Sequence, residues 1–276
     1  MSSIEVIPGK TRIGWIGTGV MGRPMCENIL KKGFSLTVYN RTASKAAALQ
    51  QLGAAVAATA AEVAAAVDVL CIMVGTPDDV QQLILGPGGV SSRLSPGDVG
   101  ARNGTLTVMA GGDAKTFENL RPLFEAVGTN IIHAGPAGSG QRMKLCNQIT
   151  LCTNLVGLAE GLLFAERAGL DIEKTLAVLS GGGAASWSVS TYGPRIRDGD
   201  FRPGFFVRHL VKDLRLALNE AARLKLALPG LGLALQLYQA LEAQGGGSLG
   251  VHALKIALNN INAQNKSIED VVGQLN

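Results

Sequence analysis

Residues 13–25, which read IGWIGTGVMGRPM, decide the fold of this chain. The apolar run Ile13–Ile16 is followed at once by the glycine pattern G-x-G-x-x-G, and we predict a helix from about Pro24 to Lys32. In such a strand-turn-helix unit the first glycine permits the tight turn, the second lets the backbone approach a pyrophosphate, and the third allows close packing of the helix on the strand. The turn amides then point at the anion from the helix N-terminus. The residues predicted to contact a dinucleotide cofactor here are Gly17, Thr18, Gly19, Val20, Met21 and Gly22.

The end of the second expected strand, LTVYN, bears on the choice of cofactor. About 20 positions after the glycines, a dinucleotide fold places the residue that reads the adenosine ribose, and NAD-selective sites have Asp or Glu there. This chain has Asn40, Arg41 and Thr42 instead. No carboxylate stands there to repel a 2′-phosphate, and the guanidinium of Arg41 is able to bind one. We therefore predict that these three residues contact the cofactor and that NADP(H) is preferred over NAD(H); an ordinary solvated arginine is the alternative interpretation.

Short apolar runs alternate with helical stretches through the first half of the chain. Further strands are expected at Val69–Val74, Thr105–Ala110 and Thr129–His133, with a helix at about 116–127 between the last two. Strands that alternate with helices indicate parallel β-α-β units. The predicted fold class of residues 1–137 is therefore α/β, a Rossmann-type doubly wound parallel sheet that binds NADP(H).

The second half of the chain, residues 138–276, is expected to be an all-α domain for substrate binding and dimerisation. Residues 141–168 are apolar on nearly every side, which indicates a long central helix that is buried all round and joins the two domains. Further helices are expected at about 171–179 and 206–226, and after Pro229 and Ser248. Because one small helical domain hardly covers every face of the long helix, a homodimer or homotetramer is predicted.

Composition and charge exclude several classes of protein. Hydrophobic residues make up 47% of the 276 residues, which is enough for a buried core and excludes a disordered chain. The net charge is +4, but Lys and Arg form no run or stripe, so no nucleic-acid partner is expected. We identify no apolar leader and no run of about 18 apolar residues, so a cytoplasmic protein without membrane association is expected. The four cysteines and three histidines lack ligand spacing, which predicts no metal site and reduced thiols in the core.

Four blocks that span nearly the whole chain stand out: IGWIGTGVMGRPM (13–25), GARNGTLTVMAGGD (100–113), GSGQRMKLCNQ (138–148) and FFVRHLVKDLRLAL (205–218). They resemble the β-hydroxyacid dehydrogenase family, which includes 3-hydroxyisobutyrate dehydrogenase, tartronate semialdehyde reductase and the glyoxylate/succinic semialdehyde reductases. The third block is the most diagnostic, with Lys144 in the place of the catalytic lysine. The resemblance implies that Phe205 and Lys212 border the nicotinamide and the substrate. It also implies that Val74 and Thr76 lie on a loop that touches the cofactor.

The residues after Lys144 leave one choice open. The family's asparagine stands four residues after the lysine, whereas here Asn147 stands three residues after it and Gln148 four. Both positions share a helix face with Lys144, so both are candidate substrate-binding residues.

The helix near residue 212 carries the other candidate charges. Because adjacent helical residues do not face each other, we expect Asp213 to hold His209, one turn away, and to leave Lys212 on the face of Arg208. Two cations on one face suit a small carboxylate substrate or a cofactor phosphate; a solvated basic face is the alternative.

One stretch that the resemblance implies is absent. Family members carry, after an S-P-G-D turn, a strand ending in D-x-[ST]-[TS], a helix, and a strand ending in D-A-P-V-S-G-G. Here Val99 runs directly into Gly100, and a β-α-β unit needs roughly 30 residues or more. The substrate-holding serine and glycines of the family therefore have no counterpart. An incomplete sequence, a deletion variant, or a partner chain that supplies the unit would explain this; we favour the first two, because every remaining block is intact.

These observations predict an NADP(H)-dependent oxidoreductase that interconverts a short β-hydroxyacid or 2-hydroxyacid with its semialdehyde or oxoacid. Lys144 is expected to give a proton to the carbonyl oxygen as a hydride arrives from the nicotinamide, and to accept it in reverse. The main alternative is a catalytically silent NADP(H)-binding oligomeric protein of the same fold, which the absent serine would permit. A 6-phosphogluconate dehydrogenase relative is disfavoured, because the chain lacks the much longer C-terminal helical domain.

Overall fold

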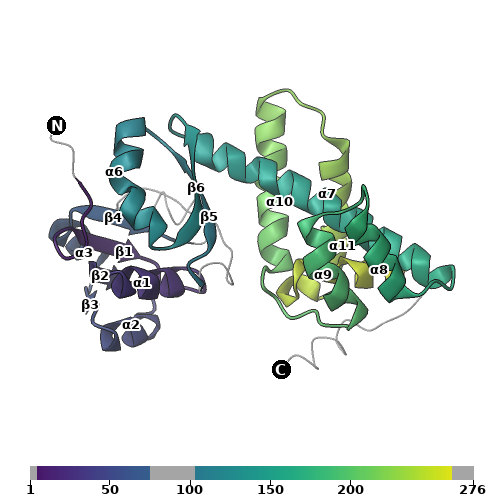
Figure 1. Cartoon of the computed structure of the whole chain (residues 1–276), viewed down its shortest axis with the longest axis horizontal. Coiled ribbons are helices and arrows are strands. Elements are labelled where there is room, and N and C mark those ends of the chain that lie inside the picture. Colours follow the sequence, from purple (N-terminus) through teal and green to yellow (C-terminus); the bar gives the residue numbers. More distant parts are fainter. Residues whose placement is uncertain (1–4, 75–102, 263–276) are drawn as a thin grey trace. The chain divides into compact units, whose positions relative to one another are not determined.

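The computed structural model describes residues 5–74 and 103–262. The chain divides into two compact units, Met1–Met143 and Lys144–Asn276. The first contains all the strands of the described chain, and the second is helical (Figure 1). Thr76 and the junction between Val99 and Gly100 lie outside the described residues.

The α/β unit begins with a four-stranded parallel sheet. Its strands are β1 (Arg12–Ile16), β2 (Ser35–Tyr39), β3 (Ala55–Val56) and β4 (Val69–Ile72), in the order β3-β2-β1-β4. Its helices are α1 (Gly22–Lys31), α2 (Ala47–Gln51) and α3 (Ala60–Ala66), and a short 3-10 turn, η1 (Ala43–Lys45), precedes α2. The parallel pairing of β1 with both β2 and β4 confirms the predicted fold class.

Alternate residues of β1 show that helices cover both faces of this sheet. Ile13 and Trp15 belong to a core cluster with residues of α1, whereas Ile16 belongs to a separate cluster with a residue of α3. A Cβ on Gly14 would lie 2.7 Å from the Val63 side chain of α3, so only glycine fits on that face. Because successive side chains of a strand point to opposite faces, this alternation is the doubly wound arrangement.

A second β-α-β unit follows in the same part of the chain. Strands β5 (Leu106–Gly111) and β6 (Gly128–Gly135) pair in parallel, and α6 (Ala114–Glu125) connects them. Val108 and Leu123 share a core cluster with Ile13 of β1. Among the described strands β5 does not pair with β4, so there are two sheets where one was expected. The division falls where the sequence lacks the expected β-α-β unit.

The helical unit is built on α7 (Ser139–Arg167), a helix of 29 residues that begins at the end of the α/β unit (Figure 1). The remaining helices are α8 (Ile172–Gly181), α9 (Trp187–Arg197), α10 (Val207–Arg223), α11 (Pro229–Ala243) and α12 (Leu254–Ile261), with short turns η2 (Gly246–Ser248) and η3 (Val251–Ala253). Leu155 and Leu162 of α7 share a core with Leu210 of α10 and Tyr238 of α11. The predicted all-α region with a long joining helix is confirmed.

Helix α9 was not expected from the sequence. It contains Gly193 and Pro194, both of which have low helix propensity. Its start is capped by Ser186, whose Oγ accepts a hydrogen bond from the Val189 amide at 3.1 Å. Burial at helical spacing outweighs the poor propensity, through Val189, Tyr192 and Ile196. The capping serine is the sequence signal that would have located this helix.

Helix α7 is buried along one face and not all round. Its buried side chains fall on one helical stripe: Gln148, Cys152, Leu155, Val156, Leu158, Ala159, Leu162 and Ala165. Phe164, by contrast, is 71% exposed. The expectation of burial on every side is wrong for the single chain, because one small helical unit does not surround a helix of this length. By length and composition α7 is also able to cross a membrane, although its buried face belongs to the core of the helical unit.

The cysteines are free thiols in different environments. Cys26 and Cys152 are buried, and Cys71 is partly buried. Cys146 is exposed on α7, so the expectation that all four thiols lie in the core is wrong for this one. It falls on the face of α7 that the helical unit leaves uncovered.

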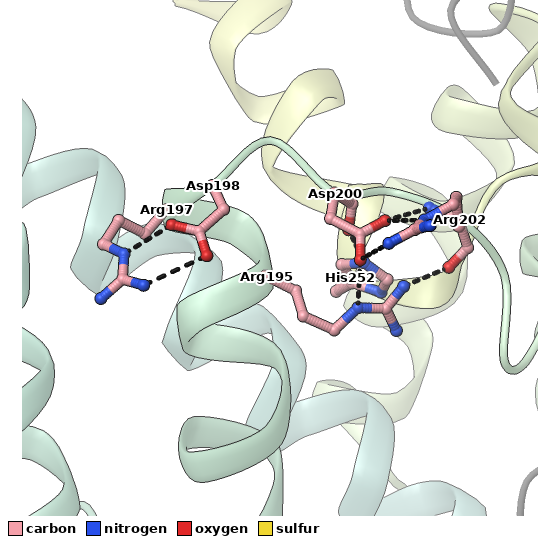
Figure 2. A network of polar contacts seen from close by, with 6 residues as sticks. All are labelled: Arg195, Arg197, Asp198, Asp200, Arg202 and His252. Atoms are coloured by element: carbon pink, nitrogen blue, oxygen red, sulfur yellow. Dashed lines mark hydrogen bonds and ion pairs between the residues drawn. The ribbon is translucent and has the colours of Figure 1, made fainter.

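A polar cluster holds the segment between α9 and α10, which leads to Phe205 (Figure 2). The Asp200 carboxylate accepts hydrogen bonds from Nε of Arg195 at 3.1 Å and Nε of Arg202 at 2.8 Å. The backbone oxygen of Asp200 lies 2.6 Å from Nε2 of His252. Burial lowers the pKa of His252 to about 4, so its ring is neutral at pH 7 and Nε2–H donates to this oxygen. The cluster thereby fixes the path of the chain into α10.

Candidate functional site

The glycine turn between β1 and α1 has the geometry that a dinucleotide needs. Gly17 has a φ of +97°, and a Cβ there would lie 2.0 Å from the Met73 carbonyl oxygen. A Cβ on Gly22 would lie 2.0 Å from the Gly17 carbonyl oxygen. Gly19 is different, since its Cβ would meet nothing within 4 Å. Packing therefore requires the first and third glycines, whereas the second leaves open the face from which a pyrophosphate would approach.

Thr18 and Asn40 are joined by a hydrogen bond across this turn. The Thr18 amide donates to Oδ1 of Asn40 at 2.9 Å, and Nδ2 of Asn40 donates to the Thr42 carbonyl oxygen at 3.0 Å. These bonds tie the end of β2 to the turn. In the described part of the chain no hydrogen bond engages the amides of Gly19 and Val20, so these two remain available to an anion. A direct contact of Thr18 or Asn40 with the cofactor stays a prediction.

Two cations lie beside the turn. Arg41 is exposed directly after β2, as the sequence predicts for a residue that reads the ribose phosphate. Lys45 was not singled out from the sequence, but its carbonyl oxygen accepts a hydrogen bond from the Thr18 hydroxyl at 3.2 Å. This bond places η1 against the glycine turn. The spacing of four residues between Arg41 and Lys45 is the signal that sequence reasoning missed.

The other predicted cofactor residues are placed as follows. Val20 is 57% exposed on the turn, whereas Met21 is buried in the same core cluster as Trp15. Val74 is partly buried after β4 and is the last residue described before the gap. Thr76 lies outside the described residues.

The three glycines give a matched pair of substitutions. Gly19→Ala should leave the free energy of unfolding within about 0.5 kcal/mol of the parent protein, because its Cβ meets nothing. It should weaken NADPH binding about tenfold or more, roughly 1.4 kcal/mol, because the methyl group fills the approach of the pyrophosphate. Gly17→Ala should instead lower stability by about 2–3 kcal/mol or more, because the residue keeps a positive φ. Urea unfolding and NADPH fluorescence titration measure both quantities, and equal stability losses for the two variants would contradict this description of the turn.

The G-S-G sequence at residues 138–140 explains how α7 starts. Gly138 has a φ of +89°, and a Cβ on Gly140 would lie 2.3 Å from the Met109 carbonyl oxygen of β5. The first turn of α7 therefore packs directly on the backbone at the end of β5. Lys144 follows one helical turn after Gly140, and its position is set by this close contact and the helix geometry.

Lys212 and Gln148 meet at a buried carboxylate, Asp213. Nζ of Lys212 lies 2.8 Å from Oδ1 of Asp213, and Nε2 of Gln148 donates to Oδ2 at 2.7 Å. The expectation that Asp213 holds His209 and leaves Lys212 on the face of Arg208 is wrong, because Lys212 pairs with Asp213. The flexible lysine stem reaches back to its neighbour, because a buried carboxylate is strongly stabilised by a cation. Asp213 is thus a member of the site that sequence reasoning had given another role.

The structure brings together four of the five residues predicted for catalysis and substrate binding. Nδ2 of Asn147 donates to Oε1 of Gln148 at 3.0 Å, and Gln148 and Lys212 both bind Asp213. Lys144 lies close enough to Asp213 and Lys212 for both charges to act on it. Phe205 lies apart from these contacts, just before α10; its carbonyl oxygen accepts the Val251 amide, and its ring packs against the core of the helical unit.

The surroundings of Lys144 lower its pKa. Burial is the largest cause; the Asp213 carboxylate raises the pKa, and Lys212 lowers it. A lysine with a lowered pKa is a stronger acid and becomes a neutral base more readily, which suits a group that gives and takes a proton. His209 nearby also has a lowered pKa, chiefly from burial and from the cation of Arg208. Across residues 5–74 and 103–262, no three His, Cys, Asp or Glu side chains gather as metal ligands do.

A glycine turn with the geometry of a dinucleotide site in one unit, and a partly buried lysine with a lowered pKa in the other, indicate a class of protein, the nicotinamide-dependent oxidoreductases. Residues 138–258 match the family model described as NAD-binding of NADP-dependent 3-hydroxyisobutyrate dehydrogenase. Residues 12–100 and 94–135 match the NAD binding domain of 6-phosphogluconate dehydrogenase. The chain belongs to the 3-hydroxyisobutyrate dehydrogenase, or β-hydroxyacid dehydrogenase, family, and the resemblance seen in the sequence is confirmed.

Individual relatives agree with this assignment. The chain is 44% identical to probable 3-hydroxyisobutyrate dehydrogenase-like 1, mitochondrial, of Arabidopsis thaliana, over 95% of this chain and 89% of the relative. It is 35% identical to 2-hydroxy-3-oxopropionate reductase of Escherichia coli (strain K12), over 90% and 97%. The structure of Mycobacterium tuberculosis 3-hydroxyisobutyrate dehydrogenase with L-serine superposes with a TM-score of 0.82 at 27% identity, covering 90% of this chain and 99% of that one.

The same comparisons bear on the absent stretch. The alignment with the Arabidopsis relative has 299 positions, but 95% of 276 residues is only about 262, so about 37 positions have no residue of this chain. The model of the nucleotide-binding domain matches in two parts that both include residues 94–100. Residues 94–100 are thus matched twice. A double match of this kind is expected when a chain lacks an internal segment of the domain and the residues at the junction are similar to both ends of the missing segment. The overlap at residues 94–100 includes Val99–Gly100, where the sequence predicts the missing segment.

Proposed function

We propose that this chain is an NADPH-preferring reductase of a short β-hydroxyacid's semialdehyde or oxoacid, with Lys144 as the proton donor. One observation carries the proposal: Lys144 lies partly buried on α7 beside a carboxylate and a second lysine, and no hydrogen bond or ion pair engages its ammonium within the described chain. Consumption of NADPH with 2-hydroxy-3-oxopropionate, the compound in the name of the E. coli relative, tests it by absorbance. No consumption with any short oxoacid or semialdehyde would overturn it.

The chemistry requires one proton and one hydride. When bound, the nicotinamide supplies the hydride to the carbonyl carbon. Lys144 then gives a proton to the carbonyl oxygen, where negative charge grows, and becomes a neutral amine. In the oxidative direction neutral Lys144 takes the hydroxyl proton as the hydride leaves. The lowered pKa of this lysine favours both roles at moderate pH.

The substrate class follows from chemistry that the relatives share. Their names and titles mention 3-hydroxyisobutyrate, 2-hydroxy-3-oxopropionate and L-serine, which are short carboxylates with an oxygen on C3. In this chain Lys212 has N–H donors beyond the one that faces Asp213, and its side chain is 33% exposed. Lys212 is therefore a suitable partner for the substrate carboxylate. Asn147 is exposed on the same stretch of α7 and supplies an amide oxygen.

Cofactor preference gives a prediction about Arg41. Arg41→Ala should weaken NADPH binding by roughly 1.5–3 kcal/mol, the scale of a hydrogen bond to a charged group, and should leave NADH binding nearly unchanged. The reason is that only NADPH carries the 2′-phosphate that a guanidinium binds. Fluorescence titration of both cofactors measures the two dissociation constants. Equal losses for NADPH and NADH would show that Arg41 does not read the phosphate.

A catalytically silent cofactor-binding protein is the second candidate, and the absent stretch favours it. The resemblance assigns the substrate-holding serine and glycines to a segment that this chain lacks between Val99 and Gly100. The intact glycine turn would still bind NADP(H). Binding of NADPH without hydride transfer to any oxoacid supports this alternative over the reductase.

We propose in addition that the chain forms a homodimer or homotetramer through the uncovered side of α7. Phe164 is 71% exposed there, and the helix around it is apolar. Covering apolar surface of this kind is a common reason for association. Light scattering at micromolar concentration is expected to give at least twice the 28.6 kDa mass of one chain, and a monomeric mass would contradict the proposal.

A further inference from the structure

Both oxygens of the Asp213 carboxylate are occupied by other side chains. Oδ1 lies 2.8 Å from Nζ of Lys212, and Oδ2 accepts a hydrogen bond from Nε2 of Gln148 at 2.7 Å. Asp213 and Gln148 are 3% and 1% exposed, so the hydrogen bond between them is shielded from water. Gln148 is itself oriented, because its Oε1 accepts a hydrogen bond from Nδ2 of Asn147. Its amide therefore presents its N–H group, and not its oxygen, to Asp213.

Lys144 stands one turn before Gln148 on the same face of α7. The charged groups that act on it are Asp213 and Lys212, both on α10. Arg208 and His209 are further titratable groups on α10, and the charges of Arg208, Lys212 and Asp213 all act on His209. Although Asp213 attracts the Lys144 ammonium, no ion pair between them forms in the described structure. The two Asp213 oxygens are instead held by Lys212 and Gln148, so the carboxylate already has a donor on each oxygen.

We propose that Gln148 is a positioning residue, whose neutral amide occupies the Asp213 oxygen that would otherwise pair with Lys144 and so keeps the Lys144 ammonium available to the substrate. This inference rests on the proposed function of Lys144. It also answers the question that the sequence left open between two amides. Gln148 is enclosed and acts through Asp213, whereas Asn147 is exposed and is the amide able to meet the substrate.

The residue type is suited to this task. A cationic residue at position 148 would add charge beside Lys144, and an anionic one would repel Asp213. An apolar residue would leave Oδ2 of the buried Asp213 without a donor, which destabilises the carboxylate. Glutamine combines a neutral donor with the reach that this contact needs, whereas asparagine is one methylene shorter.

The test is Gln148→Met, which keeps the length of the side chain and removes the donor. Oδ2 of Asp213 is then expected to pair with the Lys144 ammonium, and the pKa of Lys144 should rise, because an adjacent opposite charge favours the charged form. The readout is the pH dependence of Lys144 labelling by a small amine-reactive reagent, followed by peptide mass spectrometry. It requires no turnover. Because labelling needs the neutral amine, a raised pKa moves the labelling midpoint to higher pH.

Two further variants identify the cause. Gln236→Met makes the same change on the exposed face of α11 and should leave the midpoint unchanged. In an Asp213→Asn background, Gln148→Met should no longer shift it, because the carboxylate through which Gln148 acts is gone. If Gln148→Met does not fold, as judged by circular dichroism, Gln148→Asn replaces it and is expected to give the same shift.

The outcomes separate this inference from the proposed function. An unchanged midpoint in folded Gln148→Met, or an equal shift with and without the Asp213 carboxylate, overturns the positioning role. A shifted midpoint in a protein that reduces no oxoacid leaves the positioning role standing and removes the proposed reaction. In an active protein, the pH at which reduction declines should rise with the labelling midpoint, because the proton donor must be protonated.

Discussion

Insertion of the absent β-α-β stretch between Val99 and Gly100 is expected to raise semialdehyde turnover by about 100-fold or more, with little change in NADPH affinity. The physical reason is orientation: displacement of a reacting group by about 1 Å costs on this order, and the resemblance assigns the groups that hold the substrate to that stretch. NADPH binds through the glycine turn, which the insertion does not alter. The insert to use is the sequence that the Arabidopsis relative has between the positions that align with Val99 and Gly100.

A Gly/Ser linker of the same length is the matched control for the insertion. It restores chain length without the strand, the helix or the serine, and should give no gain in kcat/KM. Equal activity of the 276-residue chain, the linker variant and the restored protein would show that the absent stretch has no part in catalysis. A gain with the linker alone would show that only the spacing between the flanking elements matters.

Substitution of Lys144 by Met in the restored protein should lower kcat by about 10²- to 10⁴-fold, the usual contribution of a positioned general acid. NADPH affinity should stay nearly the same, because the cofactor turn lies in the other unit and the lysine acts on the carbonyl oxygen. Steady-state kinetics with a fluorescence titration of NADPH measures both effects.

Two variants sharpen the test of Lys144. Lys144→Arg keeps the positive charge but is always protonated, so it should recover part of the charge stabilisation and none of the proton transfer. Lys174→Met removes an exposed lysine of α8 and should leave kcat unchanged. An unaffected Lys144→Met variant would mean that the proton comes from another group.

Much of the fold could be predicted from the sequence, because local signals were strong. The glycine turn, the parallel strands and helices α7, α8, α10 and α11 follow from apolar periodicity and turn residues. Helix α9 was missed because Gly193 and Pro194 disfavour a helix, so its capping serine was the remaining local signal and burial supplies the rest of its stability. The one-sided burial of α7 could not be predicted either. Apolar residues on every face predict that each face is buried, but they do not identify whether this chain or another one packs against it.

The candidate site was predictable in its members but not in its contacts. Lys144, Asn147, Gln148 and Lys212 were all singled out from their spacing and from the family resemblance. The pairing of Lys212 with its neighbour Asp213 contradicts helix-face reasoning, because a long flexible side chain bends where burial of a carboxylate requires a cation. The distinction between an enclosed Gln148 and an exposed Asn147 depends on packing between α7 and α10, which no sequence pattern reports.

The most direct measurement of the central claim follows a deuterium atom. NADPH carrying deuterium at C4 of the nicotinamide is mixed with 2-hydroxy-3-oxopropionate and either the 276-residue chain or the restored protein, and the product is analysed by mass spectrometry. The account predicts deuterium on the carbinol carbon of the product, slowly with the 276-residue chain and rapidly with the restored one. NADPH binding by both proteins without deuterium in any product would contradict it and identify a cofactor-binding protein that performs no reduction.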